Sequence, residues 1–332
     1  MPASPVAPLT AALDVLMDKS LVLGYSRIGA SARRCWWPDD PAPDSLVGRH
    51  VIVTGASSGL GQATAAGLAR LGATVHLVGR SLTRLDESAD LIRTKVPEAD
   101  LLSEMCDISD LDAVRAYAAD LRERVGALHA IVHNAGLMPP ERTESAQGHE
   151  MSLATHVLGP LLLTEELRKS LAAAASPRVV IVSSGGMYSA PLNDSIGDDI
   201  EYERANYDPV RAYARTKRIQ VTLAEELADR LRGLGISVHS MHPGWADTPG
   251  ITDSLPRFAK IVGPILRTPA QGADTIVWLT AADEPVQSTG EFWCDRRVRA
   301  TYYLSWQSDD PSVRRKIWAY AARATGIPQD PT

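Results

Sequence analysis

A short apolar run, a glycine-rich loop and a helical pattern follow one another at residues 50–71. The loop, residues 54–61, reads Thr-Gly-Ala-Ser-Ser-Gly-Leu-Gly. Glycines in such a strand–loop–helix unit permit a tight turn, close approach of the backbone to a pyrophosphate, and close packing of helix on strand. The first helical turn offers free N–H groups and the positive end of the helix dipole. The unit predicts a dinucleotide site with these contact residues: Gly55, Ser57, Ser58, Gly59, Leu60 and Gly61.

Beyond this unit, short apolar runs keep alternating with helical patterns. The expected strands are 50–54, 74–78, 101–105, 128–132, 178–182 and 236–241. The expected helices are 60–71, 82–95, 110–125, 152–173 and 211–233. This alternation is typical of an α/β fold with a doubly wound, Rossmann-like parallel sheet that is covered on both faces. We expect one such domain over residues 48–332, with its ligand at the carboxyl ends of the strands.

Residues 1–47 differ in pattern and are expected to form an N-terminal helical arm and linker. A helix is expected after Pro8, and residues 38–44 are a proline- and aspartate-rich breaker. One side of this helix carries Leu9, Leu13, Leu16 and Met17. Three roles are open: packing on the main domain, covering a partner subunit, or touching a membrane surface. We favour the first, because the apolar face of an amphipathic helix usually packs on a core.

The bulk composition restricts the class of protein. A net charge of −6 and a pI of about 5.8 argue against a nucleic-acid partner, because phosphate binding needs a basic patch. The three cysteines are far apart, so neither a disulfide framework nor a metal site is expected. No segment reaches the roughly 18 apolar residues of a transmembrane helix, and the N-terminus lacks the pattern of a signal peptide. We therefore expect a cytoplasmic protein.

The glycine spacing Thr-Gly-x-x-x-Gly-x-Gly resembles that of the short-chain dehydrogenase/reductase (SDR) family. The end of the fourth expected strand resembles the family's Asn-Asn-Ala-Gly motif, with His133 in place of the first Asn. Motifs of the family occur in order over about residues 48–300. The resemblance implies a sheet-bracing Asn, contacts to the cofactor ribose after the fourth strand, and contacts to adenine after the third. The residues concerned are Asn134, Ala135 and Gly136, and Asp107 and Ile108.

Tyr213 and Lys217 form a Tyr-x-x-x-Lys motif within an expected helix, where positions i and i+4 share a face. Reduction of a carbonyl needs a proton as the hydride arrives, but a free tyrosine, with a pKa of about 10, is a poor acid–base group at neutral pH. A nearby ammonium favours the phenolate and lowers that pKa. Ser184, at the end of the fifth expected strand, can hydrogen-bond the substrate oxygen. The resemblance implies that Tyr213 and Lys217 also contact the cofactor.

His156 stands where the SDR family has an Asn that helps to hold a water in a proton relay to the lysine, through its backbone carbonyl. Two roles are open for His156: it can keep the backbone role, or it can titrate near neutral pH and join the relay. A weakened relay is the third alternative. We predict that His156→Asn leaves activity intact or raises it.

Arg80 bears on the choice of cofactor. No acidic residue follows the second expected strand to bind an adenosine ribose diol, whereas the guanidinium of Arg80 can pair with a 2′-phosphate. We therefore favour NADP(H), with NAD(H) as the alternative.

Residues after the sixth expected strand resemble the family's nicotinamide carboxamide site, which fixes the ring face exposed for hydride transfer. They are Pro243, Gly244, Trp245 and Thr248. A substrate lid is expected at about residues 245–270. Several longer phrases, among them residues 183–187 and 240–250, resemble the SDR family member twelve group. Apolar residues in the lid suggest a bulky apolar substrate.

The resulting function is hydride transfer between NADP(H) and a carbonyl or alcohol substrate. A cofactor-binding sensor or scaffold with weak turnover is the alternative, and His156 is the site residue that favours it. A nucleotide-sugar epimerase or dehydratase shares the fold and the Tyr-x-x-x-Lys motif, but the glycine spacing and the Pro-Gly region argue against it. We also expect a homo-oligomer that pairs through the helices at 152–173 and 211–233.

Overall fold

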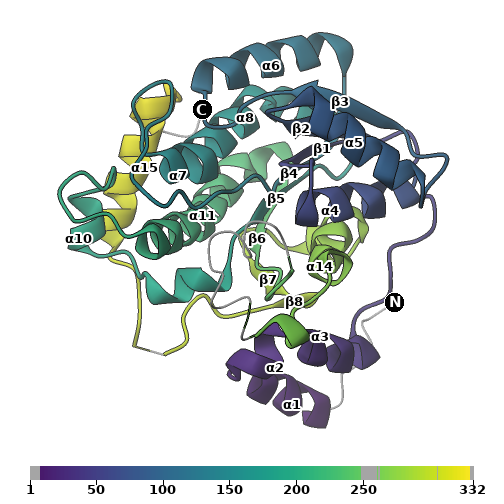
Figure 1. The fold of residues 1–332 in the computed structure, drawn as a ribbon, viewed down its shortest axis with the longest axis horizontal. Coiled ribbons are helices and arrows are strands. Elements are labelled where there is room, and N and C mark those ends of the chain that lie inside the picture. The colour runs from purple at the N-terminus through teal and green to yellow at the C-terminus, as the bar shows by residue number, and fades with distance from the viewer. Residues whose placement is uncertain (1–7, 248–259, 261, 305, 330–332) are drawn as a thin grey trace.

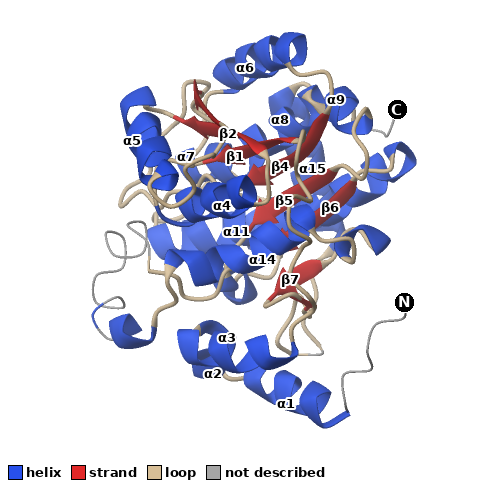
Figure 2. Ribbon diagram, turned by 90° about the vertical axis from the view of Figure 1, so that its right-hand side faces the viewer, coloured by secondary structure: helices blue, strands red, loops and turns tan. Residues whose placement is uncertain are grey.

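The computed structural model describes residues 8–247, 260, 262–304 and 306–329. Its centre is one sheet with the strand order β3-β2-β1-β4-β5-β6-β7-β8, shown in Figures 1 and 2. The strands are β1 His50–Thr54, β2 Thr74–Gly79, β3 Leu101–Met105, β4 Leu128–His133, β5 Arg178–Val182, β6 Ser237–Met241, β7 Phe292–Cys294 and β8 Arg297–Val298. Among the strand pairs of this sheet in the described residues, β7–β8 alone is antiparallel. The expected α/β class and the six expected strands are confirmed.

The central strands β4, β5 and β6 are buried at every position. This is the pattern of parallel strands that are covered on both faces, and in β5 it appears as a continuous apolar run over residues 179–182. The strand order reverses between β1 and β4, so the crevice at the carboxyl ends of these two strands is the expected ligand position of a doubly wound sheet.

Two layers of helices cover the sheet. One apolar core joins it to α4 Gly59–Arg70, α5 Leu82–Arg93 and α14 Pro269–Ala281. The other core joins it to α6 Leu111–Arg124, α8 Gly159–Glu166, α11 Pro209–Leu231 and α15 Pro311–Thr325. The helix α15 lies against α8 and α11 at the outside of this layer (Figure 1). It therefore covers part of the two helices through which we expected subunits to pair, and oligomerisation stays a prediction.

The expected helix at 152–173 is divided into several pieces. These are α7 Met151–Leu153, a π-helical turn Ala154–Leu158, α8, and α9 Arg168–Ala172. Pro160 has no N–H to donate to the carbonyl of His156 four residues earlier, so regular α-helical bonding is interrupted here. Single π-helical turns within α-helices are frequent at functional sites.

The N-terminal arm consists of three helices, α1 Pro8–Asp18, α2 Leu21–Tyr25 and α3 Arg27–Arg33, which lie beside the β7–β8 edge of the sheet (Figures 1 and 2). The expected apolar contact of α1 is partly wrong. Met17 is buried, but Leu13 and Leu16 are exposed, and the buried side of α1 also carries Asp14. The arm packs on its own domain, and buried charges rather than a leucine face hold it there. A further short helix, α10 Asp194–Gly197, lies in the segment between β5 and α11.

No helix in the described part of the chain is long and apolar enough to cross a bilayer. No group of three or more metal-ligating side chains was found in this part of the chain. Cys35, Cys106 and Cys294 are free thiols.

Candidate active site

The glycine loop lies at the switch point between β1 and β4. Gly55 has a φ of +67°, and a Cβ there would lie 2.9 Å from the Cα of Ala135. A Cβ on Gly61 would lie 2.2 Å from the carbonyl oxygen of Gly55, so the start of α4 packs directly on the loop. Gly59 also has a positive φ, +56°. Only glycine meets these conditions without strain, as the sequence predicted for a loop that a pyrophosphate approaches closely.

The first turn of α4 can receive an anion. The Ser58 side chain, at the N-cap, makes no capping hydrogen bond. The amide groups of this turn have no intrahelical acceptors, so they are available to a phosphate. The residues Ser57, Gly59 and Leu60 flank the turn and are partly accessible. The loop and helix start therefore fit a dinucleotide pyrophosphate.

Asn134 braces this loop from the end of β4. Its Nδ2 donates to the carbonyl oxygens of Thr54, at 2.9 Å, and Gly55, at 3.3 Å. The hydroxyl of Thr54 in turn accepts the N–H groups of Asn134 and Ala135, each at 3.0 Å. Sequence analysis predicted the bracing role of Asn134 and missed that of Thr54. The threonine is buried at the last position of β1, directly before the loop.

Arg80 and Asp107 follow neighbouring strands at the same edge of the sheet. The carbonyl of Val78 accepts the N–H of Gly55 at 2.8 Å, which places the end of β2 against the glycine loop. Arg80 is exposed and forms no salt bridge with a described residue. The carboxylate of Asp107 accepts hydrogen bonds from the amide and hydroxyl of Ser109 at 2.9 and 2.8 Å, while Ile108 is buried.

Ser184 and Tyr213 meet beside Gly186. A Cβ on Gly186 would lie 3.6 Å from the Oγ of Ser184 and 3.9 Å from ring atoms of Tyr213. Burial raises the pKa of Tyr213, and a hydrogen bond with Ser184 opposes that rise. The phenol is therefore protonated at neutral pH in this structure. The sequence-based expectation that Lys217 lowers this pKa remains a prediction for the cofactor-bound site.

Lys217 is buried one helical turn after Tyr213. Its ammonium donates to the carbonyl of Val182 at 2.9 Å and to the Oε1 of Gln220 at 3.0 Å. An ammonium has three protons, so one remains for a cofactor hydroxyl. Burial lowers the pKa of Lys217 to about 7. The position of a Cβ on Gly136 lies 3.7 Å from the Nζ, so Gly136 and Lys217 adjoin, and their contacts with a cofactor ribose remain a prediction.

Gln220 is a site residue that sequence analysis missed. It is fully buried, and its Nε2 donates to the main-chain carbonyl of His156 at 2.9 Å while its Oε1 accepts from Lys217. The side chain of Gln220 thus joins Lys217 to the main-chain carbonyl of His156, which stands where the SDR family has the carbonyl of its proton relay. The signal in the sequence was Pro160, which has no N–H to offer that carbonyl.

The imidazole of His156 has both nitrogens occupied. Its Nε2 accepts the N–H of Leu137 at 3.1 Å, so the proton resides on Nδ1, which donates to the hydroxyl of Thr216 at 2.8 Å. Burial, together with the charge of Lys217, lowers the pKa of His156 well below its usual value. The imidazole is therefore neutral, and both of its nitrogens are used in hydrogen bonds within the protein. Of the two predicted roles, this geometry favours the backbone role over titration.

Pro243, Gly244 and Trp245 form a loop after β6, and other parts of the chain hold it. Trp245 donates its N–H to the carbonyl of Tyr25 at 2.8 Å, and its carbonyl accepts the N–H of Arg267 at 2.7 Å. Gly244 has a φ of +73°. Thr248 lies outside the described residues, as does half of the predicted lid at 245–270. Leu266, at the far end of that segment, is buried.

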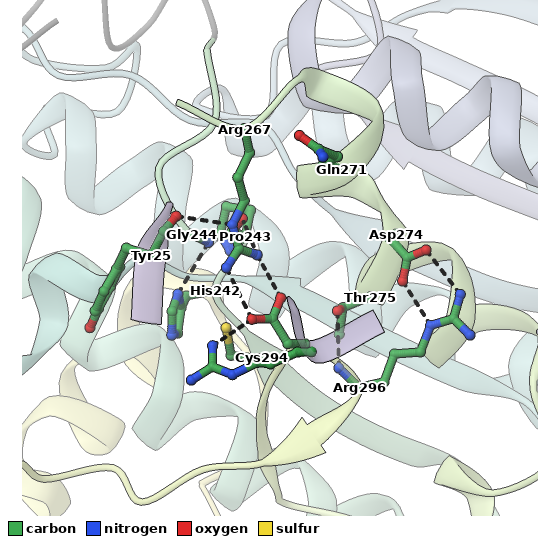
Figure 3. A network of polar contacts seen from close by, with 12 residues as sticks. Tyr25, His242, Pro243, Gly244, Arg267, Gln271, Asp274, Thr275, Cys294 and Arg296 are labelled. Atoms are coloured by element: carbon green, nitrogen blue, oxygen red, sulfur yellow. Dashed lines mark hydrogen bonds and ion pairs between the residues drawn. The ribbon is translucent and has the colours of Figure 1, made fainter. Parts of the chain in front are cut away.

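A buried ionic network anchors the arm beneath this loop (Figure 3). Asp295 pairs with Arg267 at 2.6 Å and with Arg33 of α3 at 2.7 Å. Asp14 of α1 pairs with Arg33 at 2.9 Å and also with Arg299. Burial alone would raise the pKa of Asp295, but the charges of Arg267 and Arg33 outweigh it and lower the pKa to about 2. The carboxylate is therefore charged at neutral pH.

The β7–β8 turn presents this aspartate. Asp295 and Arg296 both have positive φ, 52° and 54°, as in the type I′ turns that join two-residue hairpins. A positive φ is unfavourable for residues other than glycine, and the ion pairs of Asp295 and Arg296 hold the two residues in this conformation. Arg296 binds Asp274 of α14 at 2.7 Å and Asp40 of the linker at 2.6 Å.

Comparison with known proteins identifies the family. Residues 49–192 match the family model described as short chain dehydrogenase. Dehydrogenase/reductase SDR family member 12 from Homo sapiens is 36% identical over 274 residues, which cover 82% of this chain and 84% of that protein. Retinol dehydrogenase 14 from Mus musculus is 30% identical over 339 residues, which cover 97% and 99%.

A solved structure is similar as well. It is that of a putative NAD(P) dependent gluconate 5-dehydrogenase from Beutenbergia cavernae with bound NADP, and it is 26% identical with a TM-score of 0.61. The superposition covers 76% of this chain and 97% of that one. The chain therefore belongs to the short-chain dehydrogenase/reductase family of oxidoreductases.

Proposed function

We propose that this chain transfers a hydride between NADP(H) and an apolar carbonyl or alcohol substrate. The observation that carries the proposal is that Ser184, Tyr213 and Lys217 lie together, with Lys217 next to the turn at residues 135–136 that packs on the glycine loop. The bound nicotinamide would supply or accept the hydride. The glycine loop, Asn134, Ala135, Gly136, Tyr213 and Lys217 would hold the cofactor.

Tyr213 is the proton donor in the reductive direction. Its burial keeps the phenol protonated, and a protonated phenol can deliver its proton to the substrate oxygen as negative charge develops there. The hydroxyl of Ser184 can donate a second hydrogen bond to that oxygen. Lys217 holds a ribose hydroxyl and, when charged, stabilises the phenolate that is left after proton transfer.

NADP(H) is favoured over NAD(H) because of Arg80. Its guanidinium is exposed at the end of β2, adjacent to the strand end on which the glycine loop is hydrogen-bonded. A guanidinium in this position can form a bidentate pair with a 2′-phosphate. Bound NADP in the Beutenbergia cavernae structure supports the same cofactor class.

The apolar substrate is inferred from the side chains near the catalytic pair. The rings of Tyr188 and Tyr303 lie with their centroids 4.1 Å apart and their planes tilted by 30°, and both are partly accessible, as is Trp245. Such rings favour apolar ligands. Retinol dehydrogenase 14, named for an alcohol, is a relative that supports this substrate class.

Two measurements test the proposal. The first is calorimetric titration of the full chain with NADPH and NADH. The second is consumption of NADPH, followed by its absorbance, over a panel of aldehydes, ketones and quinones. We expect tighter binding of NADPH and turnover with at least one apolar carbonyl compound. Binding without turnover across the panel would favour the sensor or scaffold alternative, and no dinucleotide binding would refute both.

A further inference from the structure

The N-terminal arm reaches the catalytic end of the sheet through Tyr25, the last residue of α2. The ring of Tyr25 lies directly against Gly185, the residue after Ser184. A Cβ on Gly185 would lie 2.1 Å from the Cε1 of Tyr25, so this contact leaves no room for a side chain. A Cβ on the next residue, Gly186, would lie 3.9 Å from ring atoms of Tyr213. The Gly185-Gly186 pair is thus close to both the Tyr25 ring and the catalytic tyrosine.

The same ring also contacts the loop after β6. It stacks on His242 with the ring centroids 4.8 Å apart and the planes 23° apart, and it lies 5.6 Å from the ring of Trp245. Its hydroxyl pairs with that of Tyr303. Tyr25 is 5% exposed, so it lies behind the accessible rings rather than among them.

The main chain at Tyr25 is fixed as firmly as its ring. Its carbonyl accepts the N–H of Trp245 at 2.8 Å and the Nε of Arg267 at 2.9 Å. The carbonyl of Gly24 accepts from Arg267 at 3.0 Å and from Arg33 at 3.2 Å. Figure 3 shows Tyr25 and Arg267 converging on Pro243 and Gly244.

We propose that Tyr25 is a positioning residue of the active site, which holds the turn of Ser184 in register with the Pro243–Trp245 loop. This inference rests on the proposed function, because that function places the substrate oxygen at Ser184 and the nicotinamide at the loop. The family model begins at residue 49, so it assigns nothing to the arm. If Tyr25 has this role, the N-terminal arm contributes to the geometry of the active site. A displacement of about 1 Å between reacting groups can reduce a rate by about a hundredfold.

The test compares Tyr25→Leu, Tyr25→Phe and Tyr117→Leu in the full chain. Tyr117 is the matched control, because it is a similarly buried tyrosine with a hydrogen-bonded hydroxyl, but it lies on α6 and bonds Glu104. We expect Tyr25→Leu to lower kcat ten- to a hundredfold with little change in the Kd of NADPH. Tyr25→Phe, which keeps the ring, and Tyr117→Leu should stay within about threefold of wild type.

Hydrogen exchange supplies a readout that does not need turnover. In the free chain, Tyr25→Leu should accelerate amide exchange in peptides covering 183–187 and 242–247, whereas Tyr25→Phe and Tyr117→Leu should not. Unchanged exchange there, or a loss of kcat in Tyr117→Leu as large as in Tyr25→Leu, would overturn the inference. If the variants show the expected exchange pattern but the wild-type protein turns over no substrate, the result contradicts the proposed function and leaves the positioning role intact.

A second variant perturbs the same contact from its other side. Gly185→Ala leaves Tyr25 intact but places a methyl group where the ring lies. We expect it to reproduce the exchange pattern of Tyr25→Leu, so the inference is testable even if Tyr25→Leu does not fold. Exchange equal to wild type in Gly185→Ala would count against the positioning role.

Discussion

Replacing Gln220 tests how the active-site lysine is held. Gln220→Met removes both hydrogen bonds, at 2.9 Å to the His156 carbonyl and at 3.0 Å from Lys217, in a side chain with no exposed surface. A neutral hydrogen bond contributes about 1 kcal/mol and one to a charged group about 1.5–3 kcal/mol. We therefore expect the free energy of unfolding to fall by about 2.5–4 kcal/mol.

The same substitution changes the protonation of Lys217. Loss of an acceptor that stabilises the ammonium by about 1.5 kcal/mol lowers the pKa by about one unit. From a starting pKa of about 7, the charged fraction at pH 7 falls from about half to about a tenth. The kcat/KM at pH 7 should fall about fivefold, and the pH profile should move about one unit toward acid.

Gln220→Glu is the matched control. A carboxylate at the same position keeps an acceptor for Lys217 and raises its pKa, because an opposite charge favours the ammonium. Its pH profile should therefore move toward alkaline pH, although it also loses the bond to His156 and stability. The assay is kcat/KM from pH 5.5 to 9, together with urea unfolding. Superimposable profiles, or shifts of the two variants in the same direction, would refute the positioning of Lys217 by Gln220.

Further predictions concern the cofactor and the buried charges. Arg80→Asp should weaken the Kd of NADPH at least tenfold more than that of NADH in calorimetry, and equal weakening would refute the 2′-phosphate role. Gly61→Ala places a Cβ 2.2 Å from a backbone oxygen and should cost about 1–3 kcal/mol of stability and weaken NADPH binding, whereas Gly126→Ala, which has open space, should not. The pKa of Asp295 lies below its usual value, so its charged carboxylate stabilises the fold fully above about pH 4. As the pH falls toward 2, protonation of this group should lower the free energy of unfolding by about 2–3 kcal/mol in unfolding experiments. A flat stability profile over that range would contradict the network. His156→Asn should keep its kcat, because the main-chain carbonyl carries the role, and complete loss of turnover would contradict this.

Sequence patterns were sufficient to predict β1 to β6 and the glycine loop. The strands β1 to β6 are five or six residues long and alternate with helical patterns, and the glycines of the first loop have a direct steric purpose. The β7–β8 hairpin was not predicted, because its strands have three and two residues and its turn is Asp-Arg rather than the usual Asn-Gly. Helical periodicity alone also joined α7, α8 and α9 into one helix, although Pro160 was a signal for a break.

The contribution of the arm could not be read from the sequence. Asp14, Arg33 and Asp295 look like ordinary surface charges in the sequence, yet the fold buries them as partners from distant parts of the chain. Hydrophobic periodicity therefore favoured a side of α1 on which Leu13 and Leu16 are exposed. Likewise, no local pattern links Tyr25 to Gly185, because only the tertiary fold brings α2 against the end of β5.

The central claim is that the phenol of Tyr213 delivers the proton beside a bound nicotinamide, and Tyr213→Phe tests it most directly. The variant should bind NADPH with a Kd within about threefold of wild type, because the glycine loop and Lys217 are intact. With the best substrate of the panel, its kcat should fall by about a hundred- to ten-thousandfold, the usual range for loss of a general acid. Turnover within a few-fold of wild type in this variant would contradict the claim.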